Sequence, residues 1–362
     1  MTIQQIVDPS KIESELLRIW EGLVKENKMR ASLFNLVVYN RASPRTDYVR
    51  NIVQKVIEKF PCRVLFISHD PDASVSYLKT AVSVAAPKGS ASAIACDHID
   101  IGVAGTDVER VPYLILPHII PDLPVYLLWT EDPCTPNPLF KPLCERAHRL
   151  IFDSECADSL LPFAQKLLAL KKETNLELAD LNWARTEGWR DLVTSIFDSP
   201  QRISQLQNLA SVQLTYNARE TEFFCHLKVQ SIYLLAWLSS RLGWKLKNTT
   251  PALQFQFEAG GKKLDASIQS ALWPKLGSGT VISIECKTLD ETLYQFMRLP
   301  DRYHYVGIQI STPEKCELPY EYVLGQTATG QSLVQEITRK GTSRHYLGML
   351  EELIKLDRDK LC

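Results

Sequence analysis

The sequence has almost no net charge and no uninterrupted apolar run long enough to cross a bilayer. Its 362 residues contain 41 Lys and Arg against 42 Asp and Glu, a formal net charge of −1. No overall field therefore draws the chain to nucleic acid or to an anionic membrane. The longest apolar stretch, 111–129, contains four prolines, which remove backbone donors and prevent the continuous helix that a bilayer requires. We expect neither a nucleic-acid-binding nor a membrane protein.

A disulfide or zinc pattern is also missing. Nine cysteines are spread along the chain, whereas disulfide scaffolds are short, dense and secreted. No pair is spaced as CxxC and no histidine stands at the offset of a zinc ligand set, so we expect no structural metal. The N-terminus has neither the basic nor the apolar region of a signal peptide. We therefore expect a cytoplasmic protein with free thiols, and a redox-sensing role for these thiols stays open.

The sequence also lacks a glycine-rich phosphate-binding loop. Residues 40–45 read Asn-Arg-Ala-Ser-Pro-Arg after the first buried run, so neither a dinucleotide fingerprint nor a P-loop is present. Residues 277–279, Gly-Ser-Gly, precede a predicted strand, and we interpret them as a tight hairpin turn. The sequence contains no G-x-S-x-G and no H-E-x-x-H motif. It therefore predicts no catalytic residue and no cofactor.

What is present is the composition of a folded protein with about two domains, with 45% apolar and 23% charged residues. Short apolar runs at 32–39 and 63–67 flank an amphipathic helical segment, the pattern of a βαβ unit with parallel strands. Residues 78–85 and 91–103 predict a hairpin, 107–119 a helix and 125–129 a core strand. Residues 1–158 are therefore predicted to form a doubly wound, Rossmann-like α/β domain with a mainly parallel sheet and no phosphate-binding glycine motif.

The rest of the chain has a different pattern. Residues 159–210 are predicted to be almost entirely helical and to connect two domains. Residues 211–362 predict an α+β domain, which begins with a strand at 212–216 and a helix over 219–242 closed by Gly243. Alternation with period two over 253–324, without intervening helices, predicts an antiparallel meander. Residues 332–337 and 344–356 are predicted to end the chain with one or two helices.

Two neighbouring residues form a candidate ligand edge. Ser68, His69 and Asp70 follow the second predicted strand. Adjacent residues do not generally orient a nucleophile, a base and a carboxylate toward one another, but the carboxyl ends of parallel strands are where open α/β sheets bind ligands. His69 and Asp70 are therefore candidates for binding a nucleotide or a sugar phosphate. The alternative interpretation is a loop histidine with satisfied hydrogen bonds.

An unusual concentration of Trp and Arg lies within 180–192. Trp183, Arg185, Trp189 and Arg190 are interleaved there, and these residue types are the most enriched at binding hot spots. The cluster therefore suggests an interaction surface. The alternative is that Trp183 belongs to an interdomain core and that the arginines form its salt-bridged frame.

Several segments resemble one known family. Residues 180–185, Asp-Leu-Asn-Trp-Ala-Arg, and 189–192, Trp-Arg-Asp-Leu, are similar to the D-L-x-W-x-R and W-R-x-L signature of the glucose-6-phosphate dehydrogenase assembly proteins called OpcA. Residues 30–38 resemble the family's R-A-S-x-x-N-L-V-V strand, and 121–125 its P-D-L-P-V segment. Residues 236–244 match its W-L-x-S-R-L-G-W helix end. The matches follow in order from 30 to 244, and no motif of the family is identified after about 250.

The resemblance implies a function without catalysis. Members of this family promote the oligomerisation or allosteric activation of glucose-6-phosphate dehydrogenase, which feeds the oxidative pentose phosphate pathway. It implies that dehydrogenase as the partner and Trp183, Arg185, Trp189 and Arg190 as first-choice interface residues, followed by Arg241 and Trp244. The chain's own oligomeric state is not indicated. The alternative is a ligand-binding α/β protein, or a cryptic enzyme, that uses the edge at His69 and Asp70.

Overall fold

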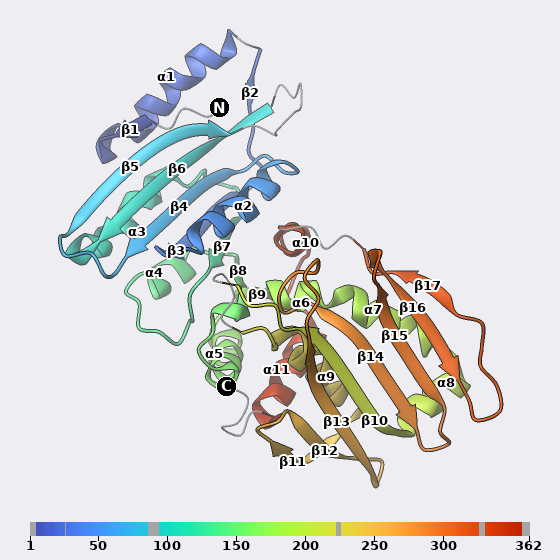
Figure 1. Cartoon of the computed structure of the whole chain (residues 1–362). Helices are drawn as coiled ribbons and strands as arrows, with labels where there is room; N and C mark the ends of the chain where they lie inside the picture. The colour runs from blue at the N-terminus through green and yellow to red at the C-terminus, as the bar shows by residue number, and fades with distance from the viewer. Residues whose placement is uncertain (1–4, 26, 86–93, 222–225, 326–329, 357–362) are drawn as a thin grey trace. The chain divides into compact units, whose positions relative to one another are not determined.

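The computed structural model describes residues 5–25, 27–85, 94–221, 226–325 and 330–356, which form two compact units (Figure 1). The first unit contains the described residues up to Asp153, together with Leu170–Leu181 and a returning segment that ends at Gly341. The second contains Ser154–Ala169, the described residues from Asn182 onward and the chain from Thr342. The division expected from the sequence, at 158 and 210, stays a prediction.

The first unit is built on a mainly parallel sheet whose strand order is β1-β5-β6-β4-β3-β7-β8-β9, with β2 beside β6. β3 pairs in parallel with β4 on one side and with β7 on the other, so the chain winds in both directions from β3. The predicted hairpin is confirmed, because the fifth and sixth strands pair antiparallel. The strands are β1 (Gln5–Val7), β2 (Met29–Arg30), β3 (Asn35–Arg41), β4 (Arg63–Asp70), β5 (Tyr77–Ala85), β6 (Ile94–Ala104), β7 (Val125–Trp129), β8 (Arg149–Phe152) and β9 (Glu177–Asp180).

Helices bury their apolar faces against this sheet. Val49, Val53 and Val56 of α2 join the buried side chains of β3 and β4 in one core, as the helical spacing predicts. Leu333, Val334 and Ile337 of α10 enter the same core, which holds the returning segment in the first unit. The helices are α1 (Ile12–Val24), α2 (Thr46–Ile57), α3 (Val111–Ile115), α4 (Phe140–Cys144) and α10 (Gln331–Thr338), with 3₁₀ turns η1 (Pro9–Lys11), η2 (Gly105–Arg110) and η3 (Leu116–His118).

Two expectations for this part of the chain need correction. The predicted helix over 107–119 is divided among η2, α3 and η3, because Pro112 and Pro117 remove backbone donors. The all-helical interpretation of 159–210 is wrong at β9, which adds a further parallel strand beside β8. Leu178, Ala179 and Asp180 of β9 are buried, so sheet pairing outweighs the local helical pattern.

The second unit is built on a sheet of eight strands in the order β11-β12-β13-β10-β14-β15-β16-β17. The prediction of an uninterrupted antiparallel meander is wrong at one place. β10 lies between β13 and β14 and pairs in parallel with β13. Residues 277–279 therefore do not form a hairpin turn between paired strands. The strands are β10 (Leu209–Asn217), β11 (Lys245–Thr250), β12 (Gln254–Ala259), β13 (Lys262–Ala271), β14 (Val281–Thr288), β15 (Leu293–Leu299), β16 (Arg302–Ser311) and β17 (Tyr320–Val323).

Among the helices of the second part of the chain, α9 is deeply buried. α9 has a buried side chain at each position from Val229 to Ser239 and packs along α11. Gly243 ends it with φ 66°, as predicted. These helices are α5 (Leu160–Glu173), α6 (Leu181–Arg185), α7 (Glu187–Ile196), α8 (Pro200–Gln207), α9 (Val229–Leu242) and α11 (Arg344–Leu356), with η4 (Ser154–Cys156). The unit boundaries at 169–170 and 181–182 fall within α5 and α6.

The predicted start of α9 at Arg219 is wrong by ten residues. Asn217 is fully buried at the end of β10, and its Nδ2 donates to the carbonyls of Trp273 and Leu276, each at 2.9 Å. Its Oδ1 accepts from the backbone N–H of Trp273 at 2.9 Å, and Nη1 of Arg219 donates to the carbonyl of Pro274 at 2.8 Å. These bonds hold the chain after β10 in a loop. The predicted fold class is nevertheless confirmed: a mainly parallel α/β sheet followed by an antiparallel-rich α+β sheet.

Candidate partner-binding site

The Trp and Arg signature folds into two short helices. Trp183 and Arg185 lie on α6, while Trp189 and Arg190 lie on α7. Trp183 is 4% exposed, Trp189 1% and Arg190 8%. All four residues belong to the second unit, where the tryptophan rings are part of the core.

Arg190 fixes Trp183 from the next helix. Its Cζ lies 3.5 Å from the centre of the Trp183 ring, a cation–π contact. Its Nη1 donates to the Trp183 carbonyl oxygen at 2.7 Å. Tyr346 of α11 also contacts the Trp183 ring. The α6–α7 corner is therefore held by one buried guanidinium that binds both the ring and the backbone.

Trp189 is enclosed on the sheet side of α7. The guanidinium of Arg298, on β15, lies 5.4 Å from the Trp189 ring centre. Arg298 donates through Nε to the Val281 carbonyl at 2.6 Å, and burial lowers its pKa to about 10. Within the described residues the indole Nε1 of Trp189 has no hydrogen-bond partner. Trp189 therefore contributes to the second unit mainly through packing.

Gly188 permits a close backbone approach next to Trp189. A Cβ placed on Gly188 would lie 2.4 Å from the carbonyl oxygen of Leu324, far inside the contact distance. A glycine inside a helix weakens it, so its place between Glu187 and Trp189 is a sequence signal of this kind of approach. Composition and motif spacing did not single out Gly188.

Arg185 belongs to a buried polar network. Its Nη1 donates to Glu155 Oε1 at 2.6 Å and to Asn182 Oδ1 at 2.8 Å. Asn182 in turn donates to Ser154 Oγ at 3.0 Å. The Arg185 side chain is 18% exposed, and Glu155 is 4% exposed. These bonds match the salt-bridged frame that the sequence left as an alternative, while the Arg185 side chain is not fully buried.

The second pair of predicted residues lies at the end of α9. Trp244 is buried and contacts Phe257 of β12, with ring centres 5.5 Å apart. Arg241 is exposed in the last turn of the helix. Burial lowers the pKa of His345, and the charges of Arg241 and Arg190 lower it further.

The six predicted partner-binding residues thus differ in accessibility. Arg241 is exposed and Arg185 partly so, whereas Trp183, Trp189, Arg190 and Trp244 are buried. Contact between these residues and a partner stays a prediction. The four buried side chains support the backbone from which the two accessible arginines project.

The predicted ligand edge lies in the first unit. His69 and Asp70 end β4, and both are partly buried. His69 Nδ1 lies 2.8 Å from Tyr39 Oη at the end of β3. Burial lowers the pKa of His69, a shift that Glu131, Asp70 and Asp72 partly oppose. The histidine is therefore neutral near pH 7 and held by a defined hydrogen bond.

The cysteines fall into buried and exposed groups. Burial raises the pKa of Cys62, and it raises that of Cys96 to about 11 and that of Cys286 to about 12, so these thiols stay protonated at neutral pH. Cys316 is exposed, and hydrogen bonds with Ser311 and Gln309 lower its pKa. Cys225 and Cys362 lie outside the described residues. The redox interpretation stays a hypothesis.

Two kinds of feature are missing from the described residues. They contain no group of three or more His, Cys, Asp or Glu side chains that could hold a metal ion. In the same part of the chain, no helix is long and apolar enough to cross a membrane.

The fold and these side chains define a class: a Rossmann-like α/β unit without a glycine phosphate loop, joined to an α+β unit with a buried Trp/Arg corner. Two family models match the chain, and both describe the glucose-6-phosphate dehydrogenase subunit. Residues 53–168 match its N-terminal domain, and residues 176–359 match its C-terminal domain. The chain belongs to the OpcA family of glucose-6-phosphate dehydrogenase assembly proteins, as its motifs predict.

Curated relatives agree with the family. The chain is 29% identical over 212 residues to the OxPP cycle protein OpcA of Nostoc punctiforme, which covers 57% of this chain and 42% of the relative. It is 27% identical over 199 residues to the OpcA protein of Synechocystis sp., covering 53% and 39%. The match thus spans about two fifths of the relatives' length.

Solved structures with a similar chain trace include a transcriptional regulator and a dehydrogenase. The transcriptional regulator Gal80p of Kluyveromyces lactis gives a TM-score of 0.49 at 10% identity, covering 93% of each chain. A levoglucosan dehydrogenase gives 0.45 at 9% identity, covering 89% of this chain and 91% of that one.

Proposed function

We propose that this chain is a non-catalytic assembly factor that binds glucose-6-phosphate dehydrogenase and promotes its active oligomer. Membership of the OpcA family, whose two models match parts of both units, is the observation that carries the proposal. The relatives' name places them in the oxidative pentose phosphate cycle. The same cycle is proposed for this chain.

The start of α2 supports a role without a dinucleotide cofactor. In doubly wound folds the pyrophosphate binds at the N-terminus of the helix that follows the first strand. Here Asn40 Nδ2 donates to Thr46 Oγ1 at 2.9 Å, and the Ser43 N–H donates to the same oxygen at 3.2 Å. Arg45 forms a buried ion pair with Asp153. These groups at the start of α2 are thus bonded to one another, and Arg45 is paired with Asp153.

Activation requires a difference in affinity between two states of the partner. A factor that binds both states equally shifts no equilibrium, however tight the binding. The chain must therefore contact a surface that exists, or is better formed, in the active oligomer. Binding of that state also stabilises it by mass action.

Arg241 and Arg185 are the proposed direct contacts, because Arg241 is exposed and the Arg185 side chain is partly exposed. Arginine provides several donors in a fixed fork and is enriched at binding hot spots. Trp183, Trp189, Arg190 and Trp244 are proposed to act from beneath by fixing the α6–α7 corner and the end of α9. An acidic patch on the dehydrogenase would complement these arginines.

The test uses the dehydrogenase of the same organism, with enzyme kinetics and light scattering at several concentrations of this chain. We expect a saturable rise in rate together with a new complex or a larger oligomer. The control is the double variant Lys247→Ala/Lys263→Ala, which removes two exposed lysines of the second unit. If neither rate nor mass changes with the wild-type chain, the assembly proposal is wrong.

A further inference from the structure

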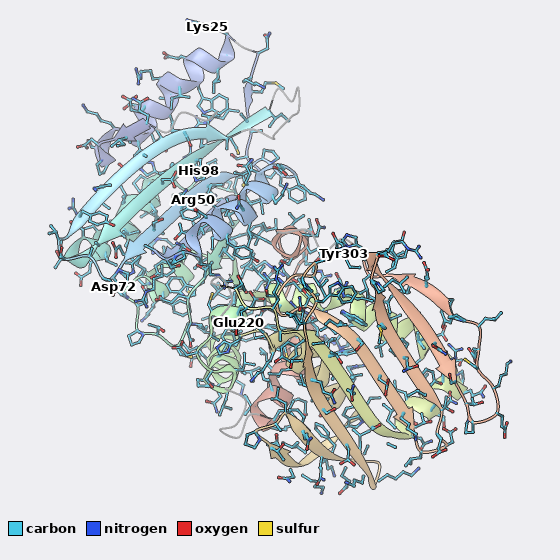
Figure 2. The ribbon with its side chains drawn as sticks, viewed as in Figure 1. Lys25, Arg50, Asp72, His98, Glu220 and Tyr303 are labelled. Atoms are coloured by element: carbon cyan, nitrogen blue, oxygen red, sulfur yellow. The ribbon has the colours of Figure 1, made fainter. Side chains whose placement is uncertain are left out.

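The first unit has a polar cluster at the point where its sheet changes winding direction. From β3 the chain passes to β4 on one side, and β7 later pairs with β3 on the other side. In open α/β sheets, the carboxyl ends of the strands at such a switch point form the ligand-binding crevice. Tyr39 and Arg41 end β3, His69 ends β4, and Glu131 and Asn137 follow β7. Figure 2 shows Asp72 at the same end of the sheet.

Tyr39 links His69 to Asn137. Asn137 Nδ2 donates to Tyr39 Oη at 2.6 Å and to Glu131 Oε2 at 2.8 Å. Burial raises the pKa of Tyr39 far above its usual value, so the phenol keeps its proton. Tyr39 Oη lies 2.8 Å from His69 Nδ1, and a hydrogen bond with Glu131 raises the pKa of the phenol further. Both neutral tautomers of His69 fit this contact: His69 Nε2 is a donor in one and an acceptor in the other.

Packed aromatic rings support the Tyr39–His69 contact. Tyr39 is fully buried and stacks on Trp129, with ring centres 3.9 Å apart and planes at 13°. The Phe140 ring packs edge-on against Trp129, with ring centres 4.8 Å apart. In the described part of the chain His69 Nε2 has no protein partner. The aromatic layer therefore holds the His69 imidazole at the partly exposed edge of the sheet.

Arg41 adds further donors, and three carboxylates add acceptors. Its Nη2 lies 3.4 Å from Asp72 Oδ2, and its Nη1 lies 3.8 Å from Glu131 Oε1. These distances are too long for strong hydrogen bonds, so the guanidinium retains donors for a ligand. Glu131 is 11% exposed, and Asp70 accepts a backbone bond from Asp72.

The charge at the edge decides the class of ligand. The charges that act on His69 are one guanidinium, Arg41, and three carboxylates, Asp70, Asp72 and Glu131, so this group of residues is net negative and repels phosphate and carboxylate groups. Hydroxyl groups suit it, because a hydroxyl donates to a carboxylate, accepts from a guanidinium N–H and pairs with an imidazole nitrogen in either tautomer. We propose that the carboxyl edge formed by Arg41, His69 and Glu131 binds a neutral polyhydroxylated molecule of the monosaccharide class. This site goes beyond the proposed assembly function, and it replaces the expected nucleotide or sugar phosphate with an uncharged sugar.

The test is binding of D-glucose and D-ribose to the full chain at pH 7.5, followed by NMR of the histidine side chains. A saturable shift of the His69 ring signals by either sugar is expected. Glu131→Gln should weaken that binding at least tenfold, as should His69→Ala measured by calorimetry. Glu109→Gln, at an exposed glutamate of the same unit, should leave it unchanged.

Further measurements distinguish an uncharged sugar from phosphate as the ligand. Inorganic phosphate should give no saturable shift of His69, and tighter binding of phosphate than of both sugars would overturn the proposed ligand class. Thermal melting of each variant shows whether it folds. If wild-type chain shows no saturable His69 shift with either sugar, the site is wrong. Because dehydrogenase is absent from this experiment, its failure leaves the assembly test unaffected.

Discussion

Arg149 and Glu336, 187 residues apart, form a buried ion pair in which Arg149 Nη2 donates to Glu336 Oε2 at 2.7 Å. Their side chains are 2% and 3% exposed. Arg149 is the first residue of β8, whereas Glu336 lies on α10. Arg149 Nη1 also donates to Glu177 at 2.8 Å and to the Gly341 carbonyl at 3.0 Å. One arginine therefore joins the returning segment of the chain to the sheet of the first unit.

Removal of Glu336 should destabilise the protein strongly. Glu336→Ala leaves a buried guanidinium without its main partner, and we expect a loss of about 3 kcal/mol in the free energy of unfolding, measured in urea. Glu177→Ala is the matched control. Glu177 is 37% exposed, so its loss should be below about 1 kcal/mol. Equal effects of the two substitutions would contradict the role assigned to Glu336.

Trp189 should act through stability. Trp189→Ala removes a core ring and should lower the free energy of unfolding by about 3 to 5 kcal/mol, as measured by chemical denaturation. Trp189→Phe retains an aromatic ring and should lower it less. If Trp189→Ala instead abolished dehydrogenase binding while unfolding stayed unchanged, Trp189 would be a direct contact.

Gly188 should tolerate no side chain. Gly188→Ala brings a Cβ against the Leu324 carbonyl, and the required backbone shift should lower stability by about 1 to 3 kcal/mol. Gly22→Ala is a control for which the opposite effect on stability is expected. Gly22 is exposed within α1 with open space around it, so alanine should stabilise the chain by up to about 1 kcal/mol. Thermal melting of both variants measures the difference.

Arg241 should affect binding without affecting folding. Arg241→Ala removes an exposed charge, so we expect unchanged thermal melting and a loss of about 1 kcal/mol or more in the binding free energy for the dehydrogenase. Titration of the rate enhancement gives the affinity, and Lys247→Ala serves as the surface control. Wild-type affinity in Arg241→Ala would remove this residue from the proposed interface.

His98 should make stability depend on pH. Burial lowers its pKa, Asp100 raises it and Arg50 lowers it again. Arg50 pairs with Asp100 at 2.6 Å, near His98 (Figure 2). Because the folded pKa is below the unfolded value of about 6.5, the unfolded state binds more protons there. The stabilisation is thus present above about pH 6.5 and lost as pH falls through the folded pKa.

Urea unfolding between pH 7.5 and 5 measures this dependence. His98→Phe should reduce the slope of stability against pH, while His304→Ala, at a partly exposed histidine of β16, should preserve the wild-type slope. His69 and His345 also have lowered pKa values, so a smaller slope is expected to remain in the His98 variant. An unchanged slope would show that His98 does not contribute.

Local pattern predicted much of the fold. Alternating and helical spacings located β7, β10, α2, α10 and α11, because burial of one face repeats with the period of each structure. The local pattern predicted the wrong structure where pairing between strands distant in the sequence decided the fold. β9 has a helical spacing but completes a parallel sheet, and β10 enters between strands that follow it much later in the sequence.

The candidate site shows the same division. Composition identified Trp183, Arg185, Trp189 and Arg190, and strand order placed His69 and Asp70 at a sheet edge. It did not identify Gly188 or Asn217, whose roles depend on backbone atoms more than 50 residues away. Nor did it identify Tyr39, which contacts His69, or Asn137, which contacts Tyr39, because these contacts form only after three strands have paired.

The sequence by itself determined the family, the fold class and the lack of a glycine phosphate loop, because these depend on residue types at fixed spacing. Only the tertiary structure decided which tryptophans are core, which arginines are exposed and which residues surround His69. Exposure and hydrogen bonding are set by neighbours distant in the chain, whose positions follow from the packing of complete sheets and helices.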